Sequence, residues 1–193
     1  IDTYIYNFHI DDQNMNAKLY MEMDLKGCVV LNHLSHSGRV AAFFKIISRL
    51  GNGVFWYVMI IATWALQGLL YSLQMLYLIL GSTVGTAIYK VLKTKTVRLR
   101  PYQVHQLIRL GDHPLDYYSF PSGHTLHAVM ATTMLGYAVP VLLILMLPFT
   151  VLVAASRMIL GLHYPSDVIV GAIIGASVAS TIILLAPSFN VIL

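Results

Sequence analysis

The fold is decided by an uncharged stretch at residues 50–89, LGNGVFWYVMIIATWALQGLLYSLQMLYLILGSTVGTAIY. It contains no Asp, Glu, Lys or Arg, and two further uncharged stretches cover residues 117–156 and 168–193. A helix that crosses the hydrocarbon core of a membrane needs about 20 apolar residues, so the first two stretches each accommodate a helical hairpin and the last accommodates one helix. Lipid offers the backbone no hydrogen-bond partners, and these stretches are far longer than barrel strands, so we expect helices.

The composition also indicates a membrane protein. Charged residues make up 10% of the chain and hydrophobic residues 58%, whereas soluble proteins have about 25% charged residues. Turn formers at Gln67-Gly68, Gly136 and Pro140 predict where the helices begin and end. We therefore expect an all-α integral membrane bundle of about five spans, at residues 53–69, 71–91, 123–138, 140–160 and 167–186.

The N-terminal segment, residues 1–50, has a different character, with five acidic and five basic residues. From Leu25 to Leu50 apolar side chains recur at helical spacing with basic residues between them. This pattern predicts a helix that does not span, lying either in the membrane interface or packed under the bundle. We expect one domain over residues 1–193, with this interfacial segment followed by spans and loops at 53–186.

Three blocks of polar residues interrupt the apolar stretches. They are Lys93-x6-Arg100-Pro101, Pro121-Ser122-Gly123-His124 and Ser156-Arg157-x5-His163-x3-Asp167. Charged groups are costly next to hydrocarbon, so their recurrence at helix ends indicates a shared polar cavity. Five spans put the ends of spans two and four, and the starts of spans three and five, on one side of the membrane. All three blocks therefore meet at one face, which supports a single site.

The first two blocks each have a chemical and a simpler interpretation. Lys93 and Arg100 offer a point charge and a planar fork that suit phosphoryl oxygens, but basic residues also flank spans as topology anchors. Pro101 is expected to stop any helix. Ser122 and His124 open a helix whose N-terminus suits an anion, although Ser122 alone would serve as a cap.

The third block has the most specific chemical interpretation of the three. Arg157 ends span four, while His163 and Asp167 lie at the start of span five. A carboxylate near an imidazole fixes its tautomer and leaves the other ring nitrogen free as a base or nucleophile. The simpler interpretation of Asp167 is an acid at the start of a helix, which is common. His124 and His127 have metal-binding spacing, but their segment holds no carboxylate or cysteine, so we expect no metal.

Several other residues are interpreted as structural or surface residues. Cys28 is the only cysteine, which excludes an internal disulfide, and we expect it to be packed. Asp112 and Asp116, in the loop before span three, are expected to be solvated turn residues. The basic run from Lys90 to Arg109 suits nucleic acid or anionic headgroups, and its position after a span favours phosphate at the membrane surface over nucleic acid.

Together the three blocks resemble the signature of the type 2 phosphatidic acid phosphatase superfamily, K-x6-R-P, P-S-G-H and S-R-x5-H-x3-D, over residues 93–167. The superfamily is similar to the vanadium haloperoxidases, but the apolar spans argue against that soluble branch. The resemblance implies a metal-independent membrane lipid phosphatase without a cofactor. It implies that His163 attacks phosphorus to form a phosphohistidine, that Asp167 orients it, and that His124 protonates the leaving oxygen and then activates water. The phosphoryl oxygens would be held by Lys93, Arg100, Ser122, Gly123 and Arg157.

Within this family the short chain resembles small bacterial members that hydrolyse polyprenyl diphosphates, which implies undecaprenyl diphosphate as substrate. Alternatives are phosphatidic acid, phosphatidylglycerol phosphate, lipid A phosphates or phosphotransfer to an acceptor lipid. A non-enzymatic lipid-binding scaffold and a transporter are the other classes, but a transporter needs polar positions in mid-span. The stripe of Gly171, Gly175 and Ala179 suits internal packing or dimerisation equally, so the oligomeric state stays open.

The orientation of the site is subject to two opposing signals. Every Lys and Arg lies on the side that bears the three blocks, which by the charge rule places that side in the cytoplasm. Three of these cations, Lys93, Arg100 and Arg157, are assigned to the site and are not topology signals. Following the family resemblance, we expect a protein of the bacterial cytoplasmic (inner) membrane whose site faces the periplasm or exterior.

Overall fold

The computed structural model describes residues 15–68 and 71–189, and the uncharged stretches fold into long helices where the sequence predicts them. These helices are α3 (Gly53–Gln67), α4 (Ser72–Lys95), α6 (Gly123–Ala138), α7 (Leu143–Ile159) and α8 (Pro165–Leu185). The turn formers act as expected, since Gly68 ends α3 in the left-handed region at φ 86° and Pro140 begins the 3₁₀ turn Pro140–Leu142 that leads into α7.

The helices differ in their capacity to cross a membrane. Among the described residues, three segments are long and apolar enough by themselves: Ser72–Lys95, Pro140–Ile159 and Pro165–Phe189. A fourth is formed if α2 (Gly38–Leu50) and α3, which meet at a 56° bend, make one broken span. The remaining predicted span, span three, corresponds to α6, which has 16 residues and packs on α3, α4, α7 and α8, so it is the central helix of the bundle.

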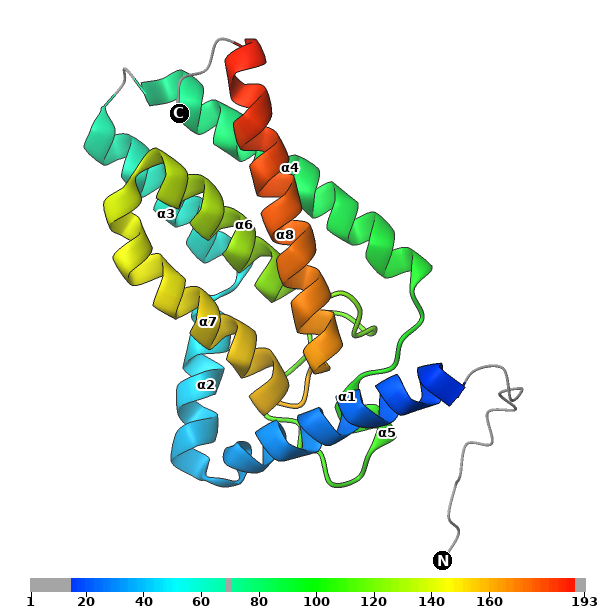
Figure 1. Cartoon of the computed structure of the whole chain (residues 1–193). Helices are drawn as coiled ribbons and strands as arrows, with labels where there is room; N and C mark the ends of the chain where they lie inside the picture. Colours follow the sequence, from blue (N-terminus) through cyan, green and yellow to red (C-terminus); the bar gives the residue numbers. More distant parts are fainter. Residues whose placement is uncertain (1–14, 69–70, 190–193) are drawn as a thin grey trace, which may run out of the picture.

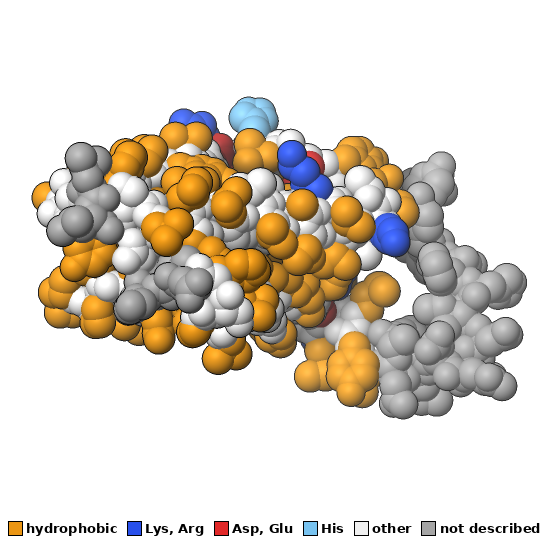
Figure 2. All heavy atoms as spheres, turned by 90° about the horizontal axis from the view of Figure 1, so that it is seen from above, with side chains coloured by type: hydrophobic (Ala, Val, Ile, Leu, Met, Phe, Trp, Pro, Cys, Tyr) orange, Lys and Arg blue, Asp and Glu red, His pale blue; other side chains and the backbone are white. Residues whose placement is uncertain are grey.

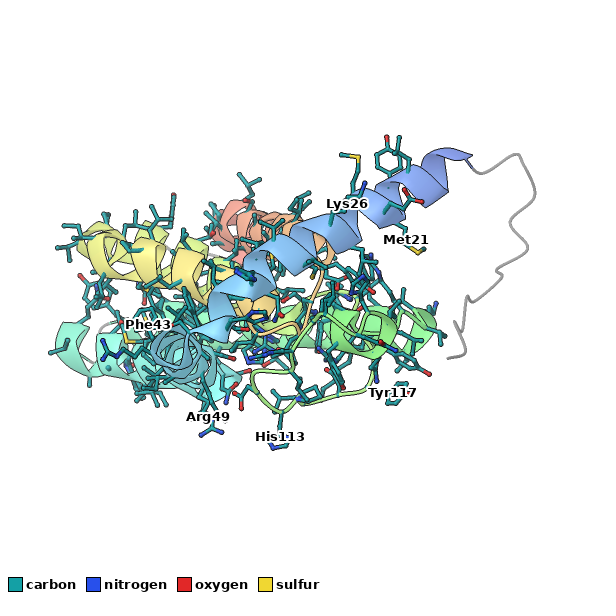
Figure 3. All side chains as sticks on the ribbon, turned by 90° about the horizontal axis from the view of Figure 1, so that it is seen from below. Met21, Lys26, Phe43, Arg49, His113 and Tyr117 are labelled. Atoms are coloured by element: carbon teal, nitrogen blue, oxygen red, sulfur yellow. The ribbon has the colours of Figure 1, made fainter. Side chains whose placement is uncertain are left out.

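The N-terminal segment contains two helices where the pattern predicts one. α1 (Met15–His33) is followed by a 3₁₀ turn (Leu34–His36) and then by α2. α1 crosses one end of the bundle and packs on α7 and α8 (Figure 1). Cys28 on α1 is buried with Ile108 and Tyr164, as expected of a packed cysteine. α1 thus packs against the bundle, and its Met21 and Lys26 are labelled in Figure 3.

The outer surface of the bundle is strongly apolar. Figure 2 shows a face on which hydrophobic side chains predominate, with a few charged ones gathered mostly toward one edge. Large apolar side chains on α3, α7 and α8 are well exposed, for example Val54, Ile144 and Leu184 at 73%, 79% and 77%. A soluble protein rarely exposes so much contiguous apolar area, whereas lipid stabilises it.

The stripe of small residues on α8 serves internal packing. Gly171, Gly175 and Ala179 are buried against α6, and a Cβ at Gly171 or Gly175 would lie 2.6 Å from the carbonyl oxygen of Ser122 or 2.4 Å from that of Leu126. The two helices are also joined where they begin, because the Ser122 amide donates to the Asp167 carbonyl at 3.1 Å. This close contact fixes the starts of α6 and α8, which carry the second and third polar blocks.

Candidate active site

The three polar blocks converge at one end of the bundle. There α4 and α7 end, α6 and α8 begin, and the loop of residues 96–122 closes the end from outside (Figure 1). A cavity of about 120 Å³ lies among them. Its lining includes six residues predicted from the sequence, namely Lys93, Arg100, Gly123, His124, Arg157 and His163. Ser122 and Asp167 are fully buried and lie behind this lining.

Lys93 and Arg100 are brought together from the two ends of the first block. Lys93 lies in the last turn of α4, which ends at Lys95, and Arg100 precedes the short helix α5 (Pro101–Val104). No helix runs through Pro101, which instead takes the first position of a new one. Lys93 Nζ lies 2.8 Å from Asp116 Oδ1, and Arg100 Nη2 donates to the same oxygen. The Arg100 side chain is buried at 1% exposure.

Arg100 also fixes the protonation of His163. Its Nη1 lies 3.3 Å from Nε2 of His163 and donates to the Leu162 carbonyl at 2.7 Å. A guanidinium can only donate, so Nε2 of neutral His163 must accept and its proton must be on Nδ1. The lone pair of Nε2 therefore faces Arg100 Nη1, and His163 must release this hydrogen bond before Nε2 can act as a nucleophile.

Asp167 lies next to His163 on the other side of the ring. Its Oδ2 is 3.6 Å from His163 Nδ1, which makes an ion pair when the imidazole is protonated but is longer than a hydrogen bond, and His163 Nδ1 has no hydrogen-bond partner among the described residues. The same oxygen accepts from the Tyr164 amide at 2.9 Å. The predicted pair is thus present, with its charge available when His163 becomes positive.

Arg98 holds Asp167 in place, a contact that sequence reasoning missed. Arg98 Nη1 donates to Asp167 Oδ1 at 2.7 Å, and its guanidinium stacks on the Tyr164 ring at 3.9 Å. Arg98 Nη2 donates to Asp24 of α1, whose Oδ1 also accepts from the Ser166 amide at 2.9 Å. α1 thereby supports the His163–Asp167 pair from beneath the bundle.

The second block forms the start of α6 as predicted, but the cap differs. Ser122 is the N-cap residue, yet its hydroxyl pairs with Thr125 Oγ1 at 2.9 Å and makes no capping hydrogen bond to the backbone. Gly123 permits close approach of Tyr89, since a Cβ there would lie 2.7 Å from its ring. His124 Nε2 is held by Asn52 Oδ1 at 2.7 Å. His127 uses both ring nitrogens, toward the Gly123 carbonyl and Thr86.

Arg157 supplies the third cation of the cavity. It lies in the last turn of α7 and is buried at 3% exposure. Nη1 donates to Ser48 Oγ of α2, while Nε has no hydrogen-bond partner among the described residues. A buried guanidinium N–H without a partner is costly, so this edge of Arg157 is suited to an incoming anion.

The two loop aspartates are not the solvated turn residues that we expected. Asp112 is 9% exposed and pairs with Lys45 at 3.6 Å and Arg49 at 3.3 Å on α2. Asp116 lines the cavity and binds Lys93, Arg100 and the Tyr89 hydroxyl. Their partners are far away in the sequence, which is why local spacing gave no signal.

The charge balance of the cavity favours a neutral nucleophile. Burial, and then the positive charges of Arg157 and Arg100, lower the pKa of His163 well below its ordinary value of 6.5. Burial would raise the pKa of Asp116, but the hydrogen bond and charge of Lys93 and the hydrogen bond from Tyr89 outweigh it and lower that pKa. At neutral pH the cavity therefore combines an uncharged imidazole with an ionised carboxylate.

The family model described as the PAP2 superfamily matches residues 73–190, more than half of the chain, and this stretch contains all three blocks. The chain belongs to the PAP2 superfamily, which confirms the resemblance drawn from the sequence.

Curated relatives match over part of their length. The decaprenylphosphoryl-5-phosphoribose phosphatase of Mycobacterium tuberculosis is 36% identical over 104 residues, covering 53% of this chain and 55% of that protein. The undecaprenyl-diphosphatase of Sulfolobus acidocaldarius is 35% identical over 101 residues, covering 51% of this chain and 48% of that protein. The matches thus span about half the length of these relatives.

Solved structures match over most of the fold. LpxE of Aquifex aeolicus superposes with a TM-score of 0.69 at 25% identity, covering 80% of this chain and 93% of that one. The transmembrane PAP2 type phosphatidylglycerolphosphate phosphatase from Bacillus subtilis gives a TM-score of 0.73 at 23% identity, covering 88% and 87%. The latter likeness is one of fold.

Proposed function

We propose that this protein is a membrane lipid phosphatase that hydrolyses a polyprenyl diphosphate, with undecaprenyl diphosphate giving undecaprenyl phosphate and inorganic phosphate. The observation that carries this proposal is the cavity itself. Three cations, Lys93, Arg100 and Arg157, line a space of about 120 Å³ that His163 also lines. A phosphoryl group suits such a cavity in charge, and preorganised cations stabilise the charge that develops in its transition state.

The reaction then proceeds in two steps. His163 Nε2 attacks the terminal phosphorus and the bond to the bridging oxygen breaks, while His124 gives a proton to that oxygen. Asp167 stabilises the positive charge that His163 acquires, and Arg98 and the Tyr164 amide keep the carboxylate in position. In the second step His124 takes a proton from water, which attacks phosphorus, and the phosphorus–nitrogen bond breaks to release phosphate. The cradle would comprise Lys93, Arg100, Arg157 and the start of α6 at Ser122 and Gly123.

An apolar groove supports a long lipid tail. It has a volume of about 710 Å³ and runs between α4 and α8 from Leu73 and Leu185 to Ile88. Ile88 directly precedes Tyr89, which lines the polar cavity. A lipid with its phosphate in the cavity would lay its tail along this groove, in contact with the membrane.

The polyprenyl assignment also rests on the two curated relatives, whose names both refer to polyprenyl substrates. Phosphatidylglycerol phosphate is the second candidate, because one structural relative is a phosphatidylglycerolphosphate phosphatase.

Following the family, we further propose that the cavity faces the periplasm or cell exterior. His113 is exposed and points away from the bundle (Figure 3), so a Cys substituted there can report the orientation. If that Cys is protected from an impermeant thiol reagent in intact cells, the proposed orientation is contradicted.

The substrate is tested by phosphate release in detergent, with undecaprenyl diphosphate, phosphatidic acid and phosphatidylglycerol phosphate compared in the presence of a chelator. We expect the largest kcat/KM for undecaprenyl diphosphate and no loss of rate with the chelator. A larger kcat/KM for phosphatidylglycerol phosphate would overturn the substrate. Release from none of the three would favour the lipid-binding scaffold, and a requirement for added divalent metal would contradict the cation cradle.

A further inference from the structure

Asp116 lies where the substrate phosphate is expected to bind. Its Oδ1 accepts from Lys93 Nζ at 2.8 Å and from Arg100 Nη2, and its Oδ2 accepts from the Tyr89 hydroxyl at 2.8 Å. Arg100 Nε also donates to the backbone carbonyl of Asp116 at 3.1 Å. A carboxylate with three such donors closely imitates one edge of a phosphoryl group.

The donors of Arg100 show how far this edge is occupied. A guanidinium has five N–H groups. Two bind Asp116 through its carbonyl and carboxylate, and two are directed at the Leu162 carbonyl and His163 Nε2. One N–H has no partner among the described residues. Arg100 therefore cannot make a bidentate contact with phosphate until the Asp116 carboxylate leaves.

Arg157, the third cation of the cavity lining, has no such carboxylate partner among the described residues. It pairs with Ser48 through Nη1, and its buried Nε has no partner in the described part of the chain. The cavity thus has one open wall at Arg157 and one wall, formed by Lys93 and Arg100, that an internal carboxylate occupies.

Asp116 is the member of this network that is placed to move. Its side chain is 35% exposed, compared with 10% for Lys93 and 1% for Arg100, and it belongs to the irregular loop before α6. Neighbouring Tyr117 points outward on the end of the bundle seen in Figure 3. The cations are anchored in the bundle, whereas the carboxylate has solvent on one side.

We propose that Asp116 is an internal competitor for phosphate, which occupies Lys93 and Arg100 in the empty site, must be displaced by the substrate phosphoryl group, and returns to help expel inorganic phosphate. The inference rests on the proposed phosphatase function and names a residue outside the family signature that sets phosphate affinity. It requires no covalent step. The balance between the two anions determines how tightly the cavity holds its product.

The test is calorimetric binding of inorganic phosphate to the detergent-solubilised protein. Asp116→Asn keeps the shape of the side chain and removes its charge, so we expect the Kd for phosphate to fall on the order of tenfold, the scale of one charge-assisted hydrogen bond. Glu22→Gln is the charge-matched control, because Glu22 is exposed on α1 and is not part of the cavity lining. Its Kd should equal that of the wild type.

A second variant tests the proposal should Asp116→Asn fail to fold. Tyr89→Phe removes the hydrogen bond to Asp116 Oδ2 and keeps the ring against Gly123, so phosphate should bind about threefold tighter. An unchanged or weaker affinity in the folded variants overturns the proposal and assigns Asp116 a purely structural role. Failure of wild type and all variants to bind phosphate overturns the phosphate site itself, which separates the two claims.

Discussion

The contact between α6 and α8 allows a quantitative prediction for Gly171→Ala. The new Cβ would lie 2.6 Å from the carbonyl oxygen of Ser122, whereas ordinary contact begins near 3.4 Å, so the two helices must separate by about 0.8 Å. The obstacle is backbone at the start of a buried helix, which has little freedom to give way. Overpacking of this kind costs about 1–3 kcal/mol of the free energy of unfolding.

The same separation should impair catalysis. Ser122 precedes the Gly123–His124 start of α6, and Gly171 lies one turn after Asp167 on α8. Moving these helices apart displaces His124 relative to the His163–Asp167 pair, and a 1 Å misplacement of reacting groups costs about a hundredfold in rate. We expect kcat to fall on the order of tenfold to a hundredfold.

Thermal unfolding and phosphate release, measured on the same detergent-solubilised preparation, test both effects. Gly38→Ala is the matched control, because a Cβ at Gly38 meets nothing within 4 Å and Ala suits the first turn of a helix. A Gly171→Ala protein with the melting temperature and kcat of the wild type would refute the packing argument.

Three further predictions concern the surroundings of the nucleophile. Arg98→Gln leaves the carboxylate of Asp167 without its ion-pair partner, so kcat should fall about tenfold or more with little change in KM. Arg98→Lys should restore part of the lost kcat. Equal rates for Arg98→Gln and wild type would contradict the positioning role. His163 must be neutral to attack phosphorus, and its pKa is lowered. We therefore expect kcat/KM to be retained as the pH falls below 6.5 and to be lost only when the pH falls through this lowered pKa. A pH profile of kcat/KM with its acid limb above 6.5 would count against this. Burial raises the pKa of the Cys28 thiol to about 12, so iodoacetamide at pH 8 should label unfolded protein quickly and native protein slowly, and Cys28→Ala should keep its activity.

The membrane-spanning part of the fold could be predicted because its signals are local. Uncharged runs and their turn formers fix the helices, and α6 lies at the predicted residues 123–138. The number of complete crossings was less accessible, since α3 and α6 are shorter than a free span and α6 is covered by its neighbours. The break between α1 and α2 has a local signal in Ser35-His36-Ser37-Gly38, which was missed because the apolar spacing near it suggested one continuous helix.

The site was predictable to the extent that its residues recur at fixed spacings. The six lining residues of the three blocks meet at the cavity as expected. The supporting contacts are long-range: Arg98 meets Asp24 across 74 residues, and His124 meets Asn52 across 72. Only 10% of the residues are charged, so charges that lie next to the blocks, such as Arg98 and Asp116, were candidates for ion pairs within the site, and that scarcity was the available signal.

The central claim is that His163 forms the covalent intermediate, and trapping that intermediate tests it most directly. The protein is mixed with substrate labelled with ³²P in the terminal phosphate, quenched in alkali within milliseconds, and mapped by mass spectrometry. We expect an acid-labile, alkali-stable phosphoryl group on His163 of the wild type, with no label and no phosphate release in His163→Ala. Label on another residue, or substantial turnover by His163→Ala, would contradict the account.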